Sequence, residues 1–149
     1  MPSNKSILIV DDDLNDIELA KKAFEKTKLP NSIVTARHGG EALDYLYRRG
    51  NFAGREGNDP VFIMLDLKMP KVSGLDVLRQ IKVDNALKLI PVVMFTSSKE
   101  ERDLLACYSL GVNSYVVKPV EFAQFSETIR QLSLYWALIN ETPPATLTA

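Results

Sequence analysis

The sequence has little of what disulfide scaffolds and most metal centres require. Its 149 residues include one cysteine and one histidine, which excludes an internal disulfide framework, a cysteine-based zinc site and a multi-histidine metal cluster. An excess of charge is also lacking, because 18 Lys and Arg against 19 Asp and Glu leave a net charge of −1. This balance argues against a nucleic-acid-binding face or a membrane-surface patch as the main role of the chain.

Long apolar runs are missing as well, and no segment approaches the length that a membrane-spanning helix needs. The run Ile7-Leu8-Ile9-Val10 is too short for a signal peptide and is followed at once by three aspartates, so we interpret it as a strand. A cytoplasmic location is therefore expected, where a single reduced thiol is ordinary. The length suits one domain, which we place at residues 1–139, followed by a disordered tail over residues 140–149.

What the chain does contain is an alternation of short apolar runs with helical patterns. The expected strands cover residues 7–10, 32–36, 61–65, 91–95 and 115–117, and a helical pattern follows each of them. Ser98-Lys99-Glu100-Glu101 has the spacing of a capping box that would begin the fourth helix. Such alternation predicts a five-stranded parallel sheet with helices on both faces, an α/β fold of flavodoxin-like architecture.

Polar residues follow four of the expected strands, at the carboxyl edge of the sheet, where open α/β sheets bind their ligands. They are Asp11-Asp12-Asp13, Asp66, Thr96 and Lys118-Pro119. Clustered carboxylates repel one another unless a proton or a cation intervenes, and Mg²⁺ takes oxygen ligands while keeping waters for a phosphate. One carboxylate beside the ion could attack phosphorus to form an aspartyl phosphate, with Thr96 and Lys118 neutralising the phosphoryl oxygens.

In this order, the motifs resemble the CheY-like receiver domain of two-component response regulators. The residues that carry the resemblance are Asp11-Asp12, Asp66-Leu67-Lys68-Met69-Pro70 with Gly74, Thr96-Ser97 and Tyr115-Val116-Val117-Lys118-Pro119. The likeness extends from about Ile7 to Leu138. It implies a CheY-like three-layer sandwich and a phosphoacceptor switch rather than an enzyme, with only intrinsic autophosphorylation and autodephosphorylation chemistry.

The resemblance assigns a role to each matching position. Asp66 would be the phosphoacceptor. Mg²⁺ or Mn²⁺ would be bound by the carboxylates of Asp12 and Asp66, by the backbone carbonyl of Lys68, and by Asp11 mostly through a water. Thr96 would bond the phosphoryl group, Lys118 would pair with it, and Tyr115 would turn inward when Thr96 moves. The bond between Lys118 and Pro119 would be cis, as it is in such proteins.

Two further features narrow the resemblance to the small response regulators that serve cyanobacterial and bacterial phytochromes. They are the long loop over residues 50–60 and the aromatic pair Tyr135-Trp136 near the end of the last helix. This finer likeness implies a phytochrome histidine kinase as the phosphodonor and a homodimer through the region of the fourth helix, fifth strand and fifth helix. The downstream protein is not specified by the sequence, and neither a nucleic acid nor a membrane is expected as a partner.

Other interpretations of the same residues stay open. The spacing of Asp11 and Asp13 also fits a small Mg²⁺-dependent phosphohydrolase of the haloacid dehalogenase type, with Asp11 as nucleophile and Asp13 as acid, although Asn15 departs from that motif. Asp13 alternatively caps the first helix. A flavin site is disfavoured because three aspartates stand where a flavin phosphate needs hydroxyls and backbone amides. Cys107 is expected to be a buried, inert thiol, and His38 a surface loop residue.

Overall fold

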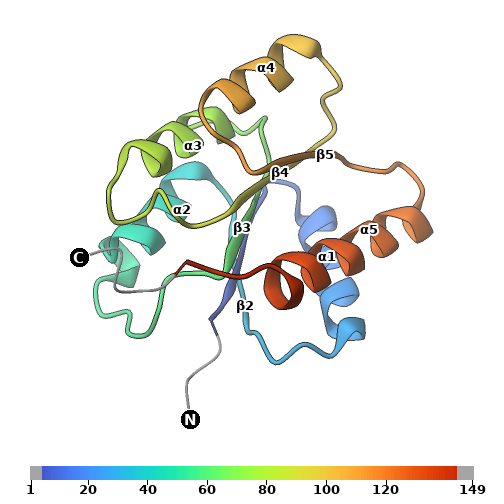
Figure 1. Ribbon diagram of the computed structural model, residues 1–149, viewed down its shortest axis with the longest axis horizontal. Helices are drawn as coiled ribbons and strands as arrows, with labels where there is room; N and C mark the ends of the chain where they lie inside the picture. Colours follow the sequence, from blue (N-terminus) through green and yellow to red (C-terminus); the bar gives the residue numbers. More distant parts are fainter. Residues whose placement is uncertain (1–4, 144–149) are drawn as a thin grey trace.

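The computed structural model describes residues 5–143 and contains one parallel sheet with the strand order β2-β1-β3-β4-β5 (Figure 1). The strands are β1 (Ile7–Val10), β2 (Ile33–Ala36), β3 (Phe62–Leu65), β4 (Val92–Thr96) and β5 (Ser114–Val117). The helices are α1 (Leu14–Thr27), α2 (Gly39–Tyr47), α3 (Gly74–Val83), α4 (Glu101–Ser109) and α5 (Phe122–Leu134), with a 3₁₀ turn at Gly50–Phe52 and a π turn at Tyr135–Ile139. The predicted α/β architecture is confirmed.

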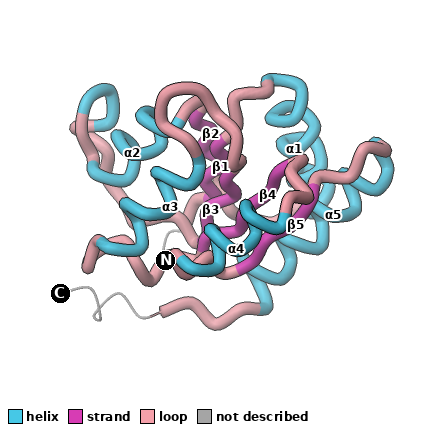
Figure 2. Tube along the Cα trace, turned by 90° about the horizontal axis from the view of Figure 1, so that it is seen from above, coloured by secondary structure: helices cyan, strands magenta, loops and turns pink. Residues whose placement is uncertain are grey.

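Alternate residues of β1, an inner strand of the sheet, enter two separate hydrophobic clusters, one on each face of the sheet. Leu8 and Val10 belong to the cluster beneath α2, α3 and α4, whereas Ile7 and Ile9 belong to the cluster beneath α1 and α5. Figure 2 shows the two groups of helices on opposite sides of the strands. A strand buried on both faces has no polar alternation, which explains the continuous apolar runs of the sequence.

The starts of α1, α2 and α3 are fixed by side chains that bind free backbone N–H groups. The Asp13 carboxylate accepts hydrogen bonds from the N–H groups of Asn15 and Asp16, so it caps α1 as one of the open interpretations proposed. His38, which we expected to be a loop residue, caps α2 through its Nδ1. A reciprocal capping box begins α3, between Ser73 and Asp76.

The capping box predicted at the start of α4 is not formed. The N-cap residue is Glu100, which makes no side-chain cap. The Ser98 hydroxyl donates to the Asp103 carboxylate, at 2.5 Å, and accepts a longer bond from the Glu100 N–H. The prediction was wrong because the Ser98 hydroxyl binds the charged Asp103 carboxylate, with which it forms a strong hydrogen bond. The sequence spacing does not show that this carboxylate lies within reach.

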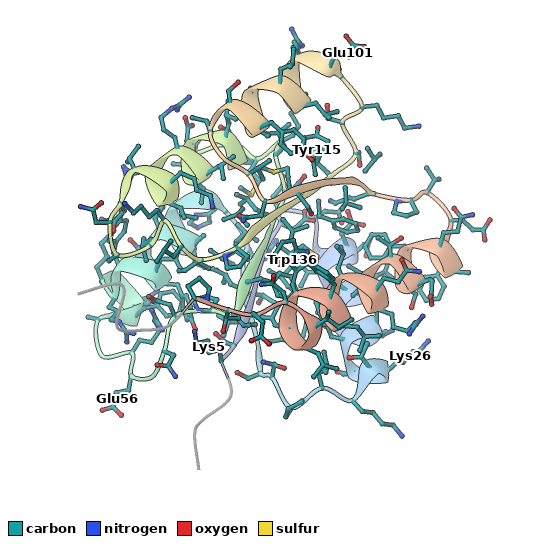
Figure 3. The ribbon with its side chains drawn as sticks, viewed as in Figure 1. Lys5, Lys26, Glu56, Glu101, Tyr115 and Trp136 are labelled. Carbon is teal, nitrogen blue, oxygen red and sulfur yellow. The ribbon has the colours of Figure 1, made fainter. Side chains whose placement is uncertain are left out.

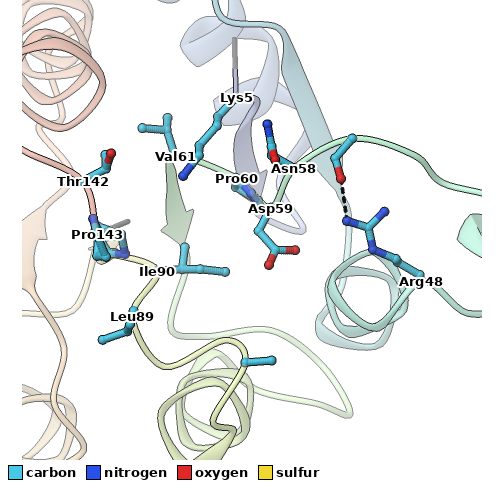
Figure 4. Close-up of a pocket in the computed structure, with 13 residues that line it drawn as sticks. Lys5, Arg48, Asn58, Asp59, Pro60, Val61, Leu89, Ile90, Thr142 and Pro143 are labelled. Carbon is cyan, nitrogen blue, oxygen red and sulfur yellow. Dashed lines mark hydrogen bonds between the residues drawn. The ribbon is translucent and has the colours of Figure 1, made fainter. Parts of the chain in front are cut away.

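The long loop between α2 and β3 is held by two arginines. The Arg48 guanidinium donates to the carbonyls of Arg55 and Gly57, the latter drawn as a dashed line in Figure 4. Arg55 stacks 4.1 Å from the centroid of the Tyr45 ring and donates to the Tyr45 carbonyl. A cavity of about 190 Å³ lies beside this loop at the amino edge of the sheet, with Lys5 and Pro143 in its lining.

Beyond α5, the chain continues into the π turn and then into the irregular residues 140–143. Trp136 is partly buried and packs on the cluster beneath α1 and α5, whereas Tyr135 and Leu138 are exposed; Figure 3 shows Trp136 lying beside the sheet. Of the tail predicted at 140–149, residues 144–149 lie outside the described part of the chain, so its disorder stays a prediction. No helix within residues 5–143 is long and apolar enough to cross a membrane.

Candidate functional site

The topology brings the predicted site residues to one edge of the sheet. Asp11 follows β1 and Asp66 follows β3, and these two strands are direct neighbours with Val10 opposite Leu65. From β1 the chain crosses to β2 on one side, and from β3 it crosses to β4 on the other. The gap beyond the ends of β1 and β3 is therefore the switch point where α/β sheets form their ligand crevice. Thr96 ends β4, and Lys118 follows β5.

Three carboxylates meet at this crevice. Asp11, Asp12 and Asp66 each offer one oxygen, and these three oxygens lie within 4.8 Å of one another. Asp11 and Asp66 are buried while Asp12 is exposed, so the cluster is open to solvent on one side. Oxygen donors from carboxylates at this spacing fit a hard divalent cation such as Mg²⁺ or Mn²⁺, which keeps some of its waters.

Lys118 is the cation that the fold supplies to this cluster. Its buried ammonium donates to Asp11 and to Asp16, at 2.7 Å each, and lies 3.8 Å from a carboxylate oxygen of Asp66. Burial opposes the charge of the ammonium, but the hydrogen bonds to Asp11 and Asp16 outweigh it and raise the pKa of Lys118 above its usual range. Lys118 therefore stays charged within reach of Asp66.

Burial suppresses the ionisation of two carboxylates of the cluster, those of Asp11 and Asp66. Burial raises the pKa of Asp66 to about 7, with the Lys118 charge acting in the opposite direction and the Asp11 charge adding to the rise. Burial also raises the pKa of Asp11, against the hydrogen bond from Lys118. A divalent cation between these groups would remove the repulsion and favour the charged form of both.

An open cleft of about 460 Å³ leads to Asp66. Lys68 lines it from the loop after β3, and the segment Thr96–Glu100 lines it from the loop after β4. The Thr96 hydroxyl accepts a hydrogen bond from the Ser98 N–H, and Tyr115 donates from its hydroxyl to the Ser98 carbonyl at 3.0 Å. Tyr115 packs against the core beneath α4, where Figure 3 labels it.

Gly74 allows α3 to approach the phosphoacceptor candidate. A Cβ atom at this position would lie 2.1 Å from the backbone oxygen of Asp66 and 2.7 Å from the Cα of Leu67. The Gly74 N–H donates to the Leu67 carbonyl, which closes the turn between β3 and α3. The glycine in the sequence motif is thus required by the space beside Asp66.

The expectation of a cis bond between Lys118 and Pro119 is wrong, since the described residues contain no cis peptide bond. The trans form is favoured by about 0.5–1 kcal/mol for X–Pro bonds. It is compatible here with a Lys118 side chain that reaches Asp11, Asp16 and Asp66. The cis expectation rested on the resemblance alone, and no other site residue depends on it.

Two acidic residues at the site were missed in the sequence. Asp16 binds Lys118, and Asp103 binds Lys68 and Ser98. Both stand in the first turn of a helix, where acids are common because they favour the positive end of the helix dipole. Asp16 stands five residues after Asp11, and Asp103 stands five residues after Ser98. This spacing was the available sequence signal, but contacts in the folded protein cannot be inferred from it. Asp13, by contrast, is committed to capping α1.

Comparison with known proteins agrees with this geometry. The model of the response regulator receiver domain matches residues 7–130. The probable methanogenesis regulatory protein FilR2 of Methanothrix harundinacea is 40% identical over 92% of this chain and 86% of its own. Response regulator Rcp1 of Synechocystis sp. is 33% identical over 95% of this chain and 94% of its own.

Solved structures give the same result. The phosphorylated cyanobacterial phytochrome response regulator RcpA has a TM-score of 0.89 and 35% identity, covering 95% of this chain and 99% of its own. The Mn²⁺-bound form of Rcp1 has a TM-score of 0.87 and 31% identity, covering 94% and 99%. The bacteriophytochrome response regulator AtBRR is 53% identical with a TM-score of 0.75, covering 94% and 100%.

Proposed function

The chain belongs to the response regulator receiver family, and from this premise we propose that it is a phosphorylatable switch with Asp66 as the phosphoacceptor. The observation that carries the proposal is the buried Asp66 carboxylate beside a charged Lys118 and two further aspartates, at the end of an open cleft. A carboxylate in this setting has a cation within reach to offset the charge of an incoming phosphoryl group.

In the proposed reaction, an Asp66 carboxylate oxygen attacks phosphorus, and the bond from phosphorus to the donor breaks with its electron pair remaining on the donor. The donor is a phosphohistidine of a sensor histidine kinase, or acetyl phosphate in its place. Lys118 and Thr96 each bind a phosphoryl oxygen. Asp12, Asp66 and the Lys68 carbonyl would hold Mg²⁺ or Mn²⁺, with Asp11 acting mostly through a water, and the ion would supply further positive charge. The structural relative Rcp1 has been solved in a Mn²⁺-bound form, which supports a divalent cation as the metal of this chain.

Phosphorylation would be transmitted through Thr96 and Tyr115. The Ser98 N–H already binds the Thr96 hydroxyl, and the Ser98 carbonyl binds Tyr115. A phosphoryl group that attracts Thr96 therefore biases the β4–α4 loop and the face formed by α4, β5 and α5, to the extent that it binds one arrangement better than the other. This face is also our candidate for a homodimer contact. We expect the downstream partner of the chain to be a protein.

A phytochrome is the proposed histidine kinase partner. The names of two structural relatives of this chain, RcpA and AtBRR, describe phytochrome and bacteriophytochrome response regulators, and AtBRR shares more than half of its aligned residues with this chain. We also propose a cytoplasmic location, because the chain must meet the kinase domain that donates the phosphoryl group, and we place that domain in the cytoplasm. Equal transfer from an unrelated histidine kinase and from a bacteriophytochrome kinase would contradict this partner assignment.

The first test is the intact mass after incubation with acetyl phosphate, with and without Mg²⁺. We expect a single phosphoryl adduct in the wild type that requires Mg²⁺. The Asp66→Asn variant, matched in shape but without a nucleophilic carboxylate, should form none while keeping its circular dichroism spectrum. An adduct of equal yield on Asp66→Asn would show that another residue is the phosphoacceptor.

A further inference from the structure

We propose that Asp103 is a positioning residue that holds Lys68 and Ser98 across the mouth of the cleft and thereby slows the loss of the phosphoryl group from Asp66. The inference rests on the proposed function, because it concerns the lifetime of the aspartyl phosphate. Asp103 lies in the first turn of α4 and is not among the residues that line the cleft. It would therefore act through the two residues that do line it.

One oxygen of Asp103 joins the two walls of the cleft. The Ser98 hydroxyl, from the loop after β4, donates to Asp103 Oδ2 at 2.5 Å, and the Lys68 ammonium, from the loop after β3, lies 3.4 Å from the same atom. The Asp103 side chain is 16% exposed, while that of Lys68 is 61% exposed. A long, solvated lysine otherwise samples many rotamers, so this contact restrains its position at the mouth.

Ser98 and Lys68 are not restrained equally by the rest of the protein. Ser98 is also held through its backbone, since its N–H binds the Thr96 hydroxyl and its carbonyl accepts from Tyr115. For the Lys68 ammonium, Asp103 is the ion-pair partner found within the described residues. Loss of the Asp103 charge would therefore release Lys68 most, and the wall after β3 would lose its tie to α4.

The position of these side chains matters for hydrolysis of the aspartyl phosphate. A water oxygen must attack phosphorus from the side opposite the Asp66 oxygen, which is the side of the open cleft. The bond between phosphorus and the Asp66 oxygen then breaks, its electron pair returns to the carboxylate, and the water proton leaves with inorganic phosphate or to solvent. Side chains tied across the mouth reduce the approach of this water in line with the breaking bond.

The test follows the phosphoryl adduct over time by intact mass, after acetyl phosphate has been removed in the presence of Mg²⁺. We expect Asp103→Asn to form the adduct but to lose it about three- to tenfold faster than the wild type, equivalent to a barrier lower by about 0.7–1.4 kcal/mol. Glu101→Gln is the matched control, because Glu101 also stands in the first turn of α4 but points away from the molecule (Figure 3). It should leave the lifetime unchanged.

Two further variants separate positioning from a general weakening of α4. Asp103→Glu keeps the charge and should restore much of the lifetime. In the Lys68→Met background, Asp103→Asn should add little, because the main group that it positions is already gone. Thermal unfolding of each variant reports on the stability of the fold independently of the lifetime.

The outcomes are distinct. An Asp103→Asn lifetime equal to or longer than that of the wild type overturns the inference, as does an equal acceleration in Glu101→Gln. Full additivity with Lys68→Met overturns the role of Lys68 in it. A wild type that takes no phosphoryl group from acetyl phosphate or from a phosphorylated histidine kinase overturns the proposed function itself, and is recognised before any lifetime is measured.

Discussion

At the scale of single residues, the buried carboxylates set the character of the site. Asp66 is surrounded by apolar strands and by Asp11, with Lys118 as the nearby cation. The cost of placing its negative charge there is visible in a pKa of about 7. A site with this property accepts a divalent cation readily, because the cation relieves a repulsion that folding has already imposed.

This burial predicts a pH-dependent effect of Asp66→Asn on stability. In EDTA, folded Asp66 keeps its proton up to about pH 7, whereas the unfolded chain loses it near the ordinary value of 3.8. Between these values the folded state binds more protons, so the contribution of Asp66 to stability falls as the pH rises. Asparagine does not titrate. Asp66→Asn should therefore raise the free energy of unfolding by roughly 1–3 kcal/mol at pH 8, and by little at pH 4.

Urea unfolding at a series of pH values measures this difference. A difference between variant and wild type that is constant from pH 4 to pH 8 would mean that Asp66 titrates alike in the folded and unfolded states. Asp12→Asn is a suitable comparison, because Asp12 is exposed and should change the stability little at either pH.

Residue types and their order were enough to predict the three aspartates, Thr96 and Lys118 as one site, because parallel strands deliver their carboxyl ends to one edge. The partners of those residues were not predictable in the same way. Asp16 and Asp103 fit the local preference of a helix start for acids, so nothing in the sequence distinguishes them from acids that face solvent. Their contacts depend on how helices settle against loops from other parts of the chain.

At the scale of elements, the turn from β3 into α3 ties the helix to the site. Gly74 lies against the backbone of Asp66, and no side chain fits between them. We expect Gly74→Ala to lower the free energy of unfolding by about 2–4 kcal/mol, since the backbone on both sides must shift to admit a methyl group. Because the displaced backbone is that of Asp66, the rate of phosphorylation by acetyl phosphate should fall as well.

Gly54→Ala provides the matched control for this prediction. A Cβ atom at Gly54 would have nothing within 4 Å, so the substitution should be close to neutral in urea unfolding and in phosphorylation. If the two variants unfolded at the same urea concentration, the close approach at Gly74 would not be a constraint on the fold.

Element boundaries were predicted to within a residue or two for the strands, because buried apolar runs have clear ends. The start of α4 was predicted less well. Ser98 and Glu101 have the spacing of a capping box, yet the Ser98 hydroxyl binds Asp103, and the reciprocal box is found at Ser73 and Asp76. When several acceptors lie near a hydroxyl, their distances in the folded protein decide which one it binds. Sequence spacing indicates these distances only in part.

At the scale of the whole molecule, one sheet separates two hydrophobic clusters and carries the site at one edge. The alternation of apolar runs with helical patterns was sufficient to predict this architecture, since parallel strands need crossover helices on both faces. The sequence did not predict how the loop over residues 50–60 is held. Arg48 and Arg55 bind its backbone carbonyls, and arginines in a polar stretch are ordinarily interpreted as solvated surface.

Binding of a divalent cation should stabilise the molecule as a whole, because the three-carboxylate cluster exists only when β1 and β3 are paired. At a Mg²⁺ concentration ten times the dissociation constant, the gain is about 1.4 kcal/mol, or roughly 3–6 °C in Tm for a chain of this size. The gain should shrink at pH 5, where protons on Asp66 compete with the cation. Scanning calorimetry with Mg²⁺ and with EDTA measures it, and an equal gain in Asp12→Asn would place the cation elsewhere.

The cavity at the amino edge of the sheet has a practical consequence for engineering. Lys5 and Pro143 both line it, so the first and last described segments come together at the end of the strands remote from Asp66. A short peptide linker between them would close the chain into a ring without touching the cleft that leads to Asp66. New termini could then be opened in an exposed loop, which would give a circularly permuted protein with attachment points for fused domains at a chosen place on the surface.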